Sequence, residues 1–171
     1  MKKINVGIIG FGMMGQRYFK ILKNKKNFNI SCIADTNRAA FETVSKNKSI
    51  FLTNAYKTIF KFKNLDLIII STTANLRYEI IKACVKNRIK FVICEKPLCR
   101  SVKEAYKIIR FKKKYSKISL NFLRRYSLTY KKIKNHILNK DIGDLKSITV
   151  QRGGGQFGSN GSHMIDLCRY L

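Results

Sequence analysis

The sequence predicts an α/β protein whose core is a parallel sheet covered by helices on both faces. Short apolar runs alternate with stretches of helical periodicity, and the runs lack the polar alternation that is typical of half-exposed strands. A glycine-rich turn directly follows the first run, and an aspartate ends the second. These observations favour a Rossmann-type, doubly wound sheet, in which ligands bind beyond the carboxyl ends of the strands.

The predicted elements alternate in the order of a βαβ protein. The apolar runs predict strands over 4–9, 30–34, 67–70, 91–94 and 118–122. Helical periodicity predicts helices near 13–25, 37–46, 76–87 and 101–115. We therefore assign residues 1–122 to a nucleotide-binding domain of the Rossmann type.

A different pattern begins after residue 122. A helical stretch over 130–139, a turn at Gly143 and a strand-like run over 146–151 precede a glycine-rich loop and a final helical pattern. So few elements cannot bury the face of a sheet by themselves. Residues 123–171 are therefore predicted to be the incomplete start of a second, α+β domain.

The glycine-rich turn has the spacing of a dinucleotide-binding fingerprint. Its residues are Gly10, Phe11, Gly12, Met13, Met14 and Gly15. We expect Gly10 to make the tight turn, Gly12 to admit a pyrophosphate, and Gly15 to allow close packing of helix and strand. The pyrophosphate would lie at a helix N-terminus, where free N–H groups and the helix dipole stabilise it. The alternative is a plain turn that uses glycine for its positive φ angles.

Asp35 lies about 20 residues beyond the turn, at the distance typical of a carboxylate that binds the adenosine ribose. It also has the residue type of a helix N-cap for the segment that begins near Thr36, and both roles are compatible. A carboxylate here hydrogen-bonds a free ribose and repels a 2′-phosphate, which favours NAD as the cofactor. Arg38 keeps NADP open, because a nearby guanidinium binds such a phosphate or stacks on adenine.

The composition excludes several classes of protein. Hydrophobic residues make up 45% of the 171 residues, which is enough for a buried core and excludes disordered and collagen-like proteins. No apolar stretch approaches the roughly 20 residues of a membrane span. The N-terminus lacks the cleavage site of a signal peptide, so we expect a cytoplasmic protein. Five cysteines without zinc-ligand spacing predict mostly buried, reduced thiols and no metal site.

The formal net charge of +27 raises the question of nucleic-acid binding. Basic clusters occur at 23–26, 112–114 and 131–134, and each falls on the polar side of a helical pattern or in a turn. No recognisable nucleic-acid module accompanies them, so we interpret the charge as a compositional bias of solvated faces. The positive field favours anionic ligands, which include a dinucleotide and a phosphorylated or carboxylated substrate.

Further motifs extend the pattern beyond the glycine-rich turn and Asp35. They are Ser71-Thr72-Thr73 after the third run, Glu95-Lys96-Pro97 at the end of the fourth, Arg125, Gly143, and Gly161-Ser162-His163-Met164-Ile165-Asp166-Leu167. With these motifs the chain resembles the glucose-fructose oxidoreductase, inositol dehydrogenase and rhizopine-catabolism (Gfo/Idh/MocA) superfamily over essentially its whole length.

This resemblance implies an NAD(P)-dependent oxidoreductase that acts on a sugar or cyclitol, with a Rossmann domain followed by a larger sheet domain. It implies that the glycine-rich turn contacts the cofactor. The other implied contacts to the cofactor come from Asp35, Arg38, Ser71, Thr72, Thr73, Glu95, Lys96, Pro97 and Arg125.

The resemblance also implies three catalytic residues whose chemistry suits hydride transfer. Oxidation of a secondary alcohol needs a group that takes the hydroxyl proton and a donor that stabilises the developing oxyanion. Lys96 suits the donor role, His163 the acid/base role, and Asp166 the orientation of that histidine. Each has a plainer alternative, since Lys96 is one of 36 Lys and Arg residues and buried His and Asp side chains often have structural roles.

The chain departs from the superfamily pattern at two places. Many relatives carry an aspartate four residues before the late histidine, where this chain has Ser159 followed by Asn160, and neither is a carboxylate base. This difference suggests another substrate class or a weaker site. Many relatives have a histidine-rich loop where this chain has Asn75 and Arg77. We interpret Arg77 as a solvated helix residue, with a contact to the cofactor or to an acidic substrate as the alternative.

The sequence leaves three functions. The first is an NAD(P)-dependent oxidoreductase, or its cofactor-binding half, that acts on a secondary hydroxyl or ketone of a sugar, cyclitol or sugar nucleotide. Its partners would be that substrate and a second copy or a completing chain. The second is a catalytically silent nucleotide-binding or interaction module. The third and weaker one is a basic nucleic-acid-binding protein.

Overall fold

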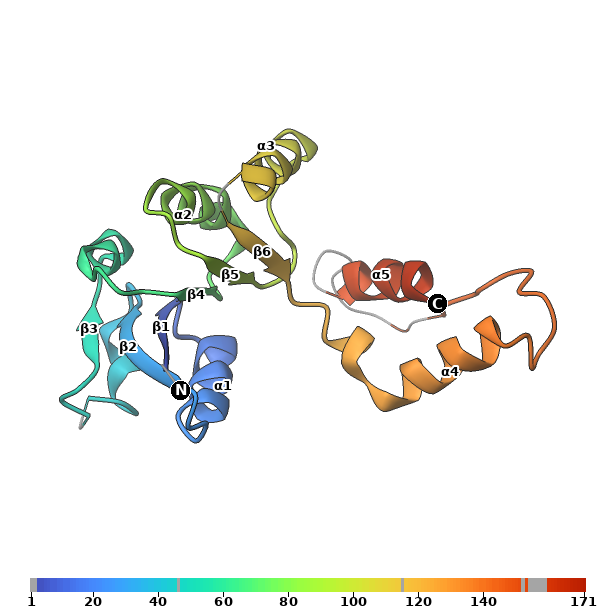
Figure 1. Cartoon of the computed structure of the whole chain (residues 1–171), viewed down its shortest axis with the longest axis horizontal. Coiled ribbons are helices and arrows are strands. Elements are labelled where there is room, and N and C mark those ends of the chain that lie inside the picture. The colour runs from blue at the N-terminus through green and yellow to red at the C-terminus, as the bar shows by residue number, and fades with distance from the viewer. Residues whose placement is uncertain (1–2, 46, 115, 152, 154–159) are drawn as a thin grey trace. The chain divides into compact units, whose positions relative to one another are not determined.

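The chain folds into two compact units, Met1–Leu120 and Asn121–Leu171, both drawn in Figure 1. The structure is a computed structural model that describes residues 3–45, 47–114, 116–151, 153 and 160–171. Each unit has its own helices, and only the first contains strands among the described residues.

The first unit is built on a six-stranded parallel sheet. Its strands are β1 (Ile4–Ile9), β2 (Phe28–Ala34), β3 (Phe51–Thr53), β4 (Leu67–Ile70), β5 (Phe91–Cys94) and β6 (Lys117–Leu120). Their spatial order is β3-β2-β1-β4-β5-β6, and all neighbouring pairs are parallel. The direction of winding reverses between β1 and β4, which makes the carboxyl ends of these two strands the switch point of the sheet.

Helices cover both faces of this sheet (Figure 1). Helix α1 (Met13–Leu22) packs with one apolar cluster of the sheet, and α2 (Ala74–Lys86) and α3 (Val102–Lys114) pack with another. All four residues of β4 are buried, as expected for a β-branched strand that is covered on both sides. The predicted α/β class and the doubly wound parallel sheet are therefore confirmed.

Two sequence predictions about the middle of the first unit were wrong. The helix expected over 37–46 is a short 3₁₀ helix over Arg38–Phe41, which Asn37 caps by accepting a hydrogen bond from the Ala39 N–H, and turns follow it. The residues that follow include three of types with low helix propensity, Thr43, Val44 and Ser45. Strand β3 was missed, since three half-exposed residues carry no detectable periodicity. A second 3₁₀ helix, Tyr56–Lys61, follows β3.

The second unit consists of helices among its described residues. A 3₁₀ helix (Leu123–Tyr126) packs with both α4 (Leu128–Leu138) and α5 (Ser162–Tyr170). The strand expected over 146–151 is absent from the described part of that run, and its described residues are exposed. A strand needs a neighbouring strand for its hydrogen bonds, and the described part of this unit offers none. The glycine-rich loop that precedes α5 lies largely outside the described residues.

The cysteines are free, as the sequence predicted, and Cys32, Cys84 and Cys94 are buried. Burial raises the pKa of Cys32 and of Cys94 to about 12, so both thiols stay protonated at neutral pH. Cys99 and Cys168 are half-buried. Among the described residues, no helix combines the length and apolarity needed to span a bilayer.

Candidate functional site

A cleft of about 310 Å³ lies at the carboxyl edge of the sheet in the first unit. It is lined by the ends of β1, β2 and β4 and by the segments that follow them. Six of the sequence-predicted cofactor residues line it: Gly10, Gly12, Asp35, Ser71, Thr72 and Thr73. The switch point of the sheet thus carries a cleft, at the position where doubly wound proteins bind their ligands.

Gly10 brings the glycine-rich turn against the loop after β4. Its φ angle is +88°, and a Cβ added there would lie 2.7 Å from the carbonyl carbon of Ser71. The Ser71 hydroxyl donates a hydrogen bond of 2.6 Å to the Gly10 carbonyl, and the Ser71 N–H donates to the Ile9 carbonyl at 2.8 Å. Both the conformation and the lack of space require glycine at this position.

Gly15 is closely packed, whereas Gly12 borders open space. A Cβ on Gly15 would lie 2.1 Å from the carbonyl oxygen of Gly10, so that α1 can approach the turn only without a side chain there. A Cβ on Gly12 would meet no atom within 4 Å. Gly12 is the N-cap of α1 and lines the cleft, so bare main chain borders open space at a helix N-terminus. These features fit the diphosphate of a dinucleotide.

Asp35 links the end of β2 to the glycine-rich turn. Its Oδ2 accepts a hydrogen bond from the Phe11 N–H, and its Oδ1 accepts one of 2.8 Å from the Asn37 N–H. An ionised carboxylate has about four acceptor positions, so Asp35 retains capacity for a ligand in the cleft. The expected N-cap role at Asp35 was wrong, because Asn37 caps the 3₁₀ helix that follows.

The remaining residues of the first unit that were expected at the cofactor do not line this cleft. The Phe11 side chain is fully buried and packs edge-on against Phe19, whereas Met13 is 83% exposed. Met14 and Gly15 lie within α1, and Arg38 is exposed in its 3₁₀ helix. The turn therefore presents main chain to the cleft.

Residues that the sequence analysis missed also line the cleft. Asn54 and Tyr56 follow β3, and Leu76 lies in the first turn of α2. Asn54 directly follows β3. If β3 had been recognised in the sequence, Asn54 would have been expected at the carboxyl edge of the sheet, where the cleft lies. Leu76 adds an apolar side chain to the cleft lining.

Glu95, Lys96 and Pro97 leave the sheet from β5, next to the loop after β4. Glu95 is buried and accepts a hydrogen bond of 2.8 Å from the Tyr18 hydroxyl, which ties it to α1. Lys96 is half-buried, and the peptide bond between Lys96 and Pro97 is cis.

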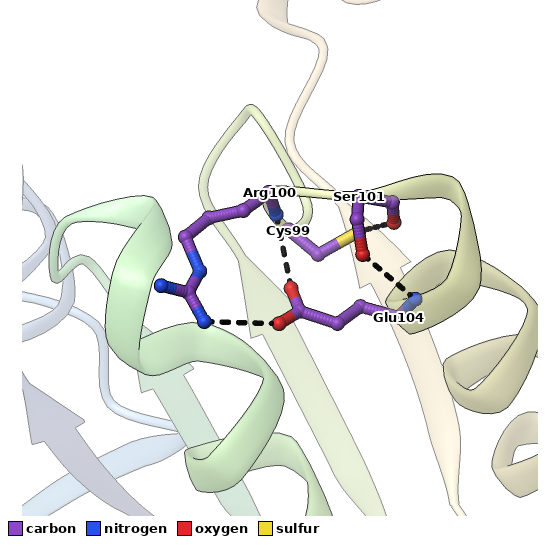
Figure 2. A network of polar contacts seen from close by, with 4 residues as sticks. All are labelled: Cys99, Arg100, Ser101 and Glu104. Atoms are coloured by element: carbon purple, nitrogen blue, oxygen red, sulfur yellow. Dashed lines mark hydrogen bonds and ion pairs between the residues drawn. The ribbon is translucent and has the colours of Figure 1, made fainter.

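A network of polar contacts anchors the chain between Pro97 and α3 (Figure 2). The Ser101 hydroxyl accepts a hydrogen bond of 3.2 Å from the Glu104 N–H, and the Glu104 carboxylate accepts one of 3.0 Å from the Arg100 N–H. The Cys99 thiol donates to the Ser101 carbonyl at 3.3 Å. The bond from the Arg100 N–H lowers the pKa of Glu104. This is the arrangement of a helix cap, and it holds the loop that follows Lys96.

Arg77 corrects a sequence interpretation. It was expected to be a solvated residue of a helix, but it is 5% exposed in α2. Its guanidinium donates hydrogen bonds to the carbonyl oxygens of Thr72 and Pro97. Burial lowers the pKa of Arg77.

The second unit brings together Arg125, His163 and Asp166. Arg125 donates two hydrogen bonds to the Asp166 carboxylate, of 2.8 Å and 2.6 Å, and they raise the pKa of Arg125. The His163 ring lies edge-on to Phe122, with 5.9 Å between the ring centroids. The Arg125 guanidinium lies 5.9 Å from the Phe122 ring centroid and 5.7 Å from that of Tyr170. Asp166 is buried and engaged by Arg125, a pairing that the sequence analysis did not anticipate.

Asn160 directly precedes Gly161, the N-cap of α5, whereas Ser159 lies outside the described residues.

The profile of the oxidoreductase family with an NAD-binding Rossmann fold, the Gfo/Idh/MocA family, matches residues 4–122. The chain belongs to this family. The resemblance drawn from the Gfo/Idh/MocA motifs is therefore confirmed, and the fold described above is that of an oxidoreductase family with an NAD-binding Rossmann fold.

Relatives of this Gfo/Idh/MocA chain include inositol dehydrogenases. A myo-inositol 2-dehydrogenase of Thermotoga maritima is 26% identical over 185 residues, which cover 98% of this chain and 54% of the relative. An uncharacterised oxidoreductase, YrbE, of Bacillus subtilis is 26% identical and covers 99% and 54%. The chain thus spans about half the length of these curated relatives.

A solved structure agrees with the fold. The scyllo-inositol dehydrogenase from Lactobacillus casei, with bound NAD(H) and scyllo-inositol, has a TM-score of 0.87 at 20% identity. That comparison covers 99% of this chain and 56% of the other.

Proposed function

We propose that this chain binds NAD(H) in the cleft at the switch point and is the cofactor-binding part of a dehydrogenase. The observation that carries the proposal is the open space beside Gly12, where the N-cap of α1 faces the cleft. Main-chain N–H groups at such a helix end stabilise a diphosphate without a charged side chain. In this proposal residues 1–122 form the cofactor domain, and 123–171 begin the substrate domain.

Asp35 sets the proposed preference for NAD. Its carboxylate lines the cleft at the end of β2, where it can accept hydrogen bonds from both ribose hydroxyls. A 2′-phosphate would meet this negative charge at close range. Arg38 is exposed outside the cleft lining, which supports NAD over NADP.

The proposed chemistry is hydride transfer at a secondary carbon. The nicotinamide, when bound, supplies the hydride acceptor or donor. Lys96 donates a hydrogen bond to the substrate oxygen as charge develops on it, and His163 takes or returns the hydroxyl proton. In this proposal Asp166 is a positioning residue that orients His163. The Arg125 guanidinium in turn holds Asp166, because it donates hydrogen bonds to both oxygens of the Asp166 carboxylate. Arg125 remains a proposed contact to the cofactor, and its pairing with Asp166 supports a further role in ordering α5.

The proposed substrate is a cyclitol, a sugar or a sugar nucleotide. The Lactobacillus casei relative was solved with scyllo-inositol, and a WlbA dehydrogenase from Chromobacterium violaceum was solved with NADH and UDP-GlcNAcA. Both ligands contain a ring that carries secondary hydroxyl groups. The proposed partner of this chain is a second copy or another chain. We propose a cytoplasmic location, in keeping with the NAD-binding family and the free cysteines.

Calorimetric titration of the chain with NADH tests cofactor binding. We expect a dissociation constant in the roughly micromolar range and loss of binding in Gly12→Val, because the added isopropyl group would fill the space beside the helix N-terminus. Gly153→Val is the matched control, since a Cβ there also meets no atom within 4 Å. Absence of heat with NAD, NADH, NADP and NADPH, or equal binding by both variants, would contradict the proposal.

A catalytically silent nucleotide-binding module is the second candidate. It is favoured by the position of the cleft, whose lining residues all lie within residues 4–122 that the NAD-binding family profile matches. Absorbance of NADH during incubation with a panel of inositols, sugars and UDP-sugars separates the two candidates. Turnover that disappears in Lys96→Ala excludes the silent module, and binding without turnover supports it.

A further inference from the structure

Arg77 is a buried cation whose hydrogen bonds all end on main-chain oxygens. It lies in the first turn of α2. Its Nε donates a hydrogen bond of 3.0 Å to the Thr72 carbonyl, Nη2 donates to the same oxygen, and Nη1 donates to the Pro97 carbonyl. The planar guanidinium therefore bridges two backbone segments at once.

The two segments leave the sheet side by side. Ile70 and Cys94, the last residues of β4 and β5, are register partners in neighbouring parallel strands. Thr72 belongs to the loop after β4 and lines the cleft. Pro97 belongs to the loop after β5 and directly follows Lys96. Arg77 thus connects a wall of the cleft to the loop that carries Lys96, the proposed hydrogen-bond donor to the substrate oxygen.

The position is costly for a cation that serves only to fill space. Burial removes water from the guanidinium, and the first turn of a helix is the positive end of its dipole. An apolar side chain would fill the same volume without that cost. Lysine could not replace the arginine fully, because an ammonium lacks the rigid fork that reaches two separate carbonyls.

The geometry points to Arg77 as the positioning residue that fixes the Lys96–Pro97 loop against the cleft, so that one guanidinium sets the spacing between the bound cofactor and Lys96. The coupling of the two loops is inferred only from the hydrogen bonds that Arg77 donates to Thr72 and Pro97. Its consequence for cofactor affinity rests on the proposed function.

Hydrogen exchange of the nucleotide-free chain, followed by mass spectrometry, tests the coupling. In Arg77→Lys we expect exchange to accelerate about tenfold in both the 71–73 and the 95–99 segments, because hydrogen bonds to a charged group are lost from each. Exchange in β1 and β2 should not change. The control is Arg110→Lys, an exposed arginine of α3, which should leave both segments unaltered.

Three results would overturn the inference. They are acceleration in only one segment, acceleration in neither, or equal acceleration throughout the sheet, which would show a general structural role. If Arg77→Lys fails to fold, NMR of the wild-type guanidinium decides. We expect slowed rotation about the Nε–Cζ bond and protected Nε–H and Nη–H protons at Arg77, and fast averaging there, as at Arg110, would contradict the bridge.

NADH titration of the same variants separates this inference from the proposed function. We expect Arg77→Lys to weaken NADH binding about tenfold while the exchange of β1 and β2 stays unchanged. If the wild-type chain binds no NADH, the proposed function fails, and the exchange data from the nucleotide-free chain still decide the coupling. If the loops loosen and NADH affinity does not change, the role of Arg77 at the cofactor site is wrong.

Discussion

The Asp35 carboxylate both holds the glycine-rich turn and lines the cleft. One oxygen accepts from the Phe11 N–H and the other from the Asn37 N–H, so the residue ties the glycine-rich turn to the end of β2. The same side chain lines the cleft. Its place in the main-chain network fixes its orientation before a ligand arrives, and an aspartate at this position favours a ribose without a 2′-phosphate.

Substitution of Asp35 by asparagine should change the choice of cofactor. Asp35→Asn removes the negative charge and turns one acceptor into a donor, so we expect NADH affinity to fall about tenfold and the preference for NADH over NADPH to shrink. Parallel titrations with both nucleotides measure the ratio. Asp144→Asn, at an exposed pair with Lys140, is the control. An unchanged ratio would argue against a ribose contact at Asp35.

At the scale of elements, the position of α1 depends on the absence of one side chain. A methyl group on Gly15 would lie 2.1 Å from the Gly10 carbonyl oxygen, and this oxygen cannot retreat freely because it also accepts from the Ser71 hydroxyl. The helix, the turn and the loop after β4 therefore meet at a single crowded point.

Gly15→Ala tests this close approach. We expect the free energy of unfolding to fall by about 1–3 kcal/mol, because α1 must shift away from the turn. Urea denaturation followed by circular dichroism measures the change. Gly153→Ala, where an added Cβ meets nothing within 4 Å, should have little effect. Equal stability of the Gly15→Ala and wild-type chains would show that the helix can move without cost.

Most of the first unit was predictable because its strands are short and buried on both faces. The run Leu67–Ile70 is fully buried and has no polar alternation, which is the pattern of a central parallel strand. Strand β3 is short and half-exposed, so its pairing with β2 is visible only in three dimensions. At 146–151, a run that the structure describes, a strand was expected and none is found, because a composition typical of strands does not supply the neighbouring strand that a sheet requires.

The candidate site was predictable where it depends on local sequence. The glycine spacing identifies the turn after β1, and Asp35 identifies the end of β2. The pair of Arg125 and Asp166 and the burial of Arg77 depend on partners distant in the chain, and the residue types alone do not reveal them. Arg77 resembled the many exposed basic residues around it, so composition favoured the wrong interpretation.

At the scale of the whole molecule, the charge is the dominant property. Thirty-six Lys and Arg residues against nine Asp and Glu residues give a net charge of +27. Such a field attracts polyanions of any kind, and it also favours a dinucleotide. A general electrostatic attraction and a shaped cleft differ in how they respond to salt.

Salt should therefore separate the two kinds of binding. We expect affinity for a single-stranded oligonucleotide to vanish near physiological ionic strength, whereas NADH binding persists because main-chain groups and a defined cleft contribute to it. Fluorescence anisotropy of a labelled oligonucleotide and NADH fluorescence, measured over the same salt series, check this. Oligonucleotide binding that survives moderate salt would favour the nucleic-acid alternative.

The hydrogen bonds of Ser71 also affect how a ligand binds in the cleft. Its N–H and hydroxyl fasten the loop after β4 to the end of β1 and to the turn of Gly10, so the floor of the cleft is preorganised. Little conformational entropy is then left for an arriving ligand to remove. Association should be governed by diffusion and by the electric field of the protein, and the lifetime of the complex should vary more than its rate of formation.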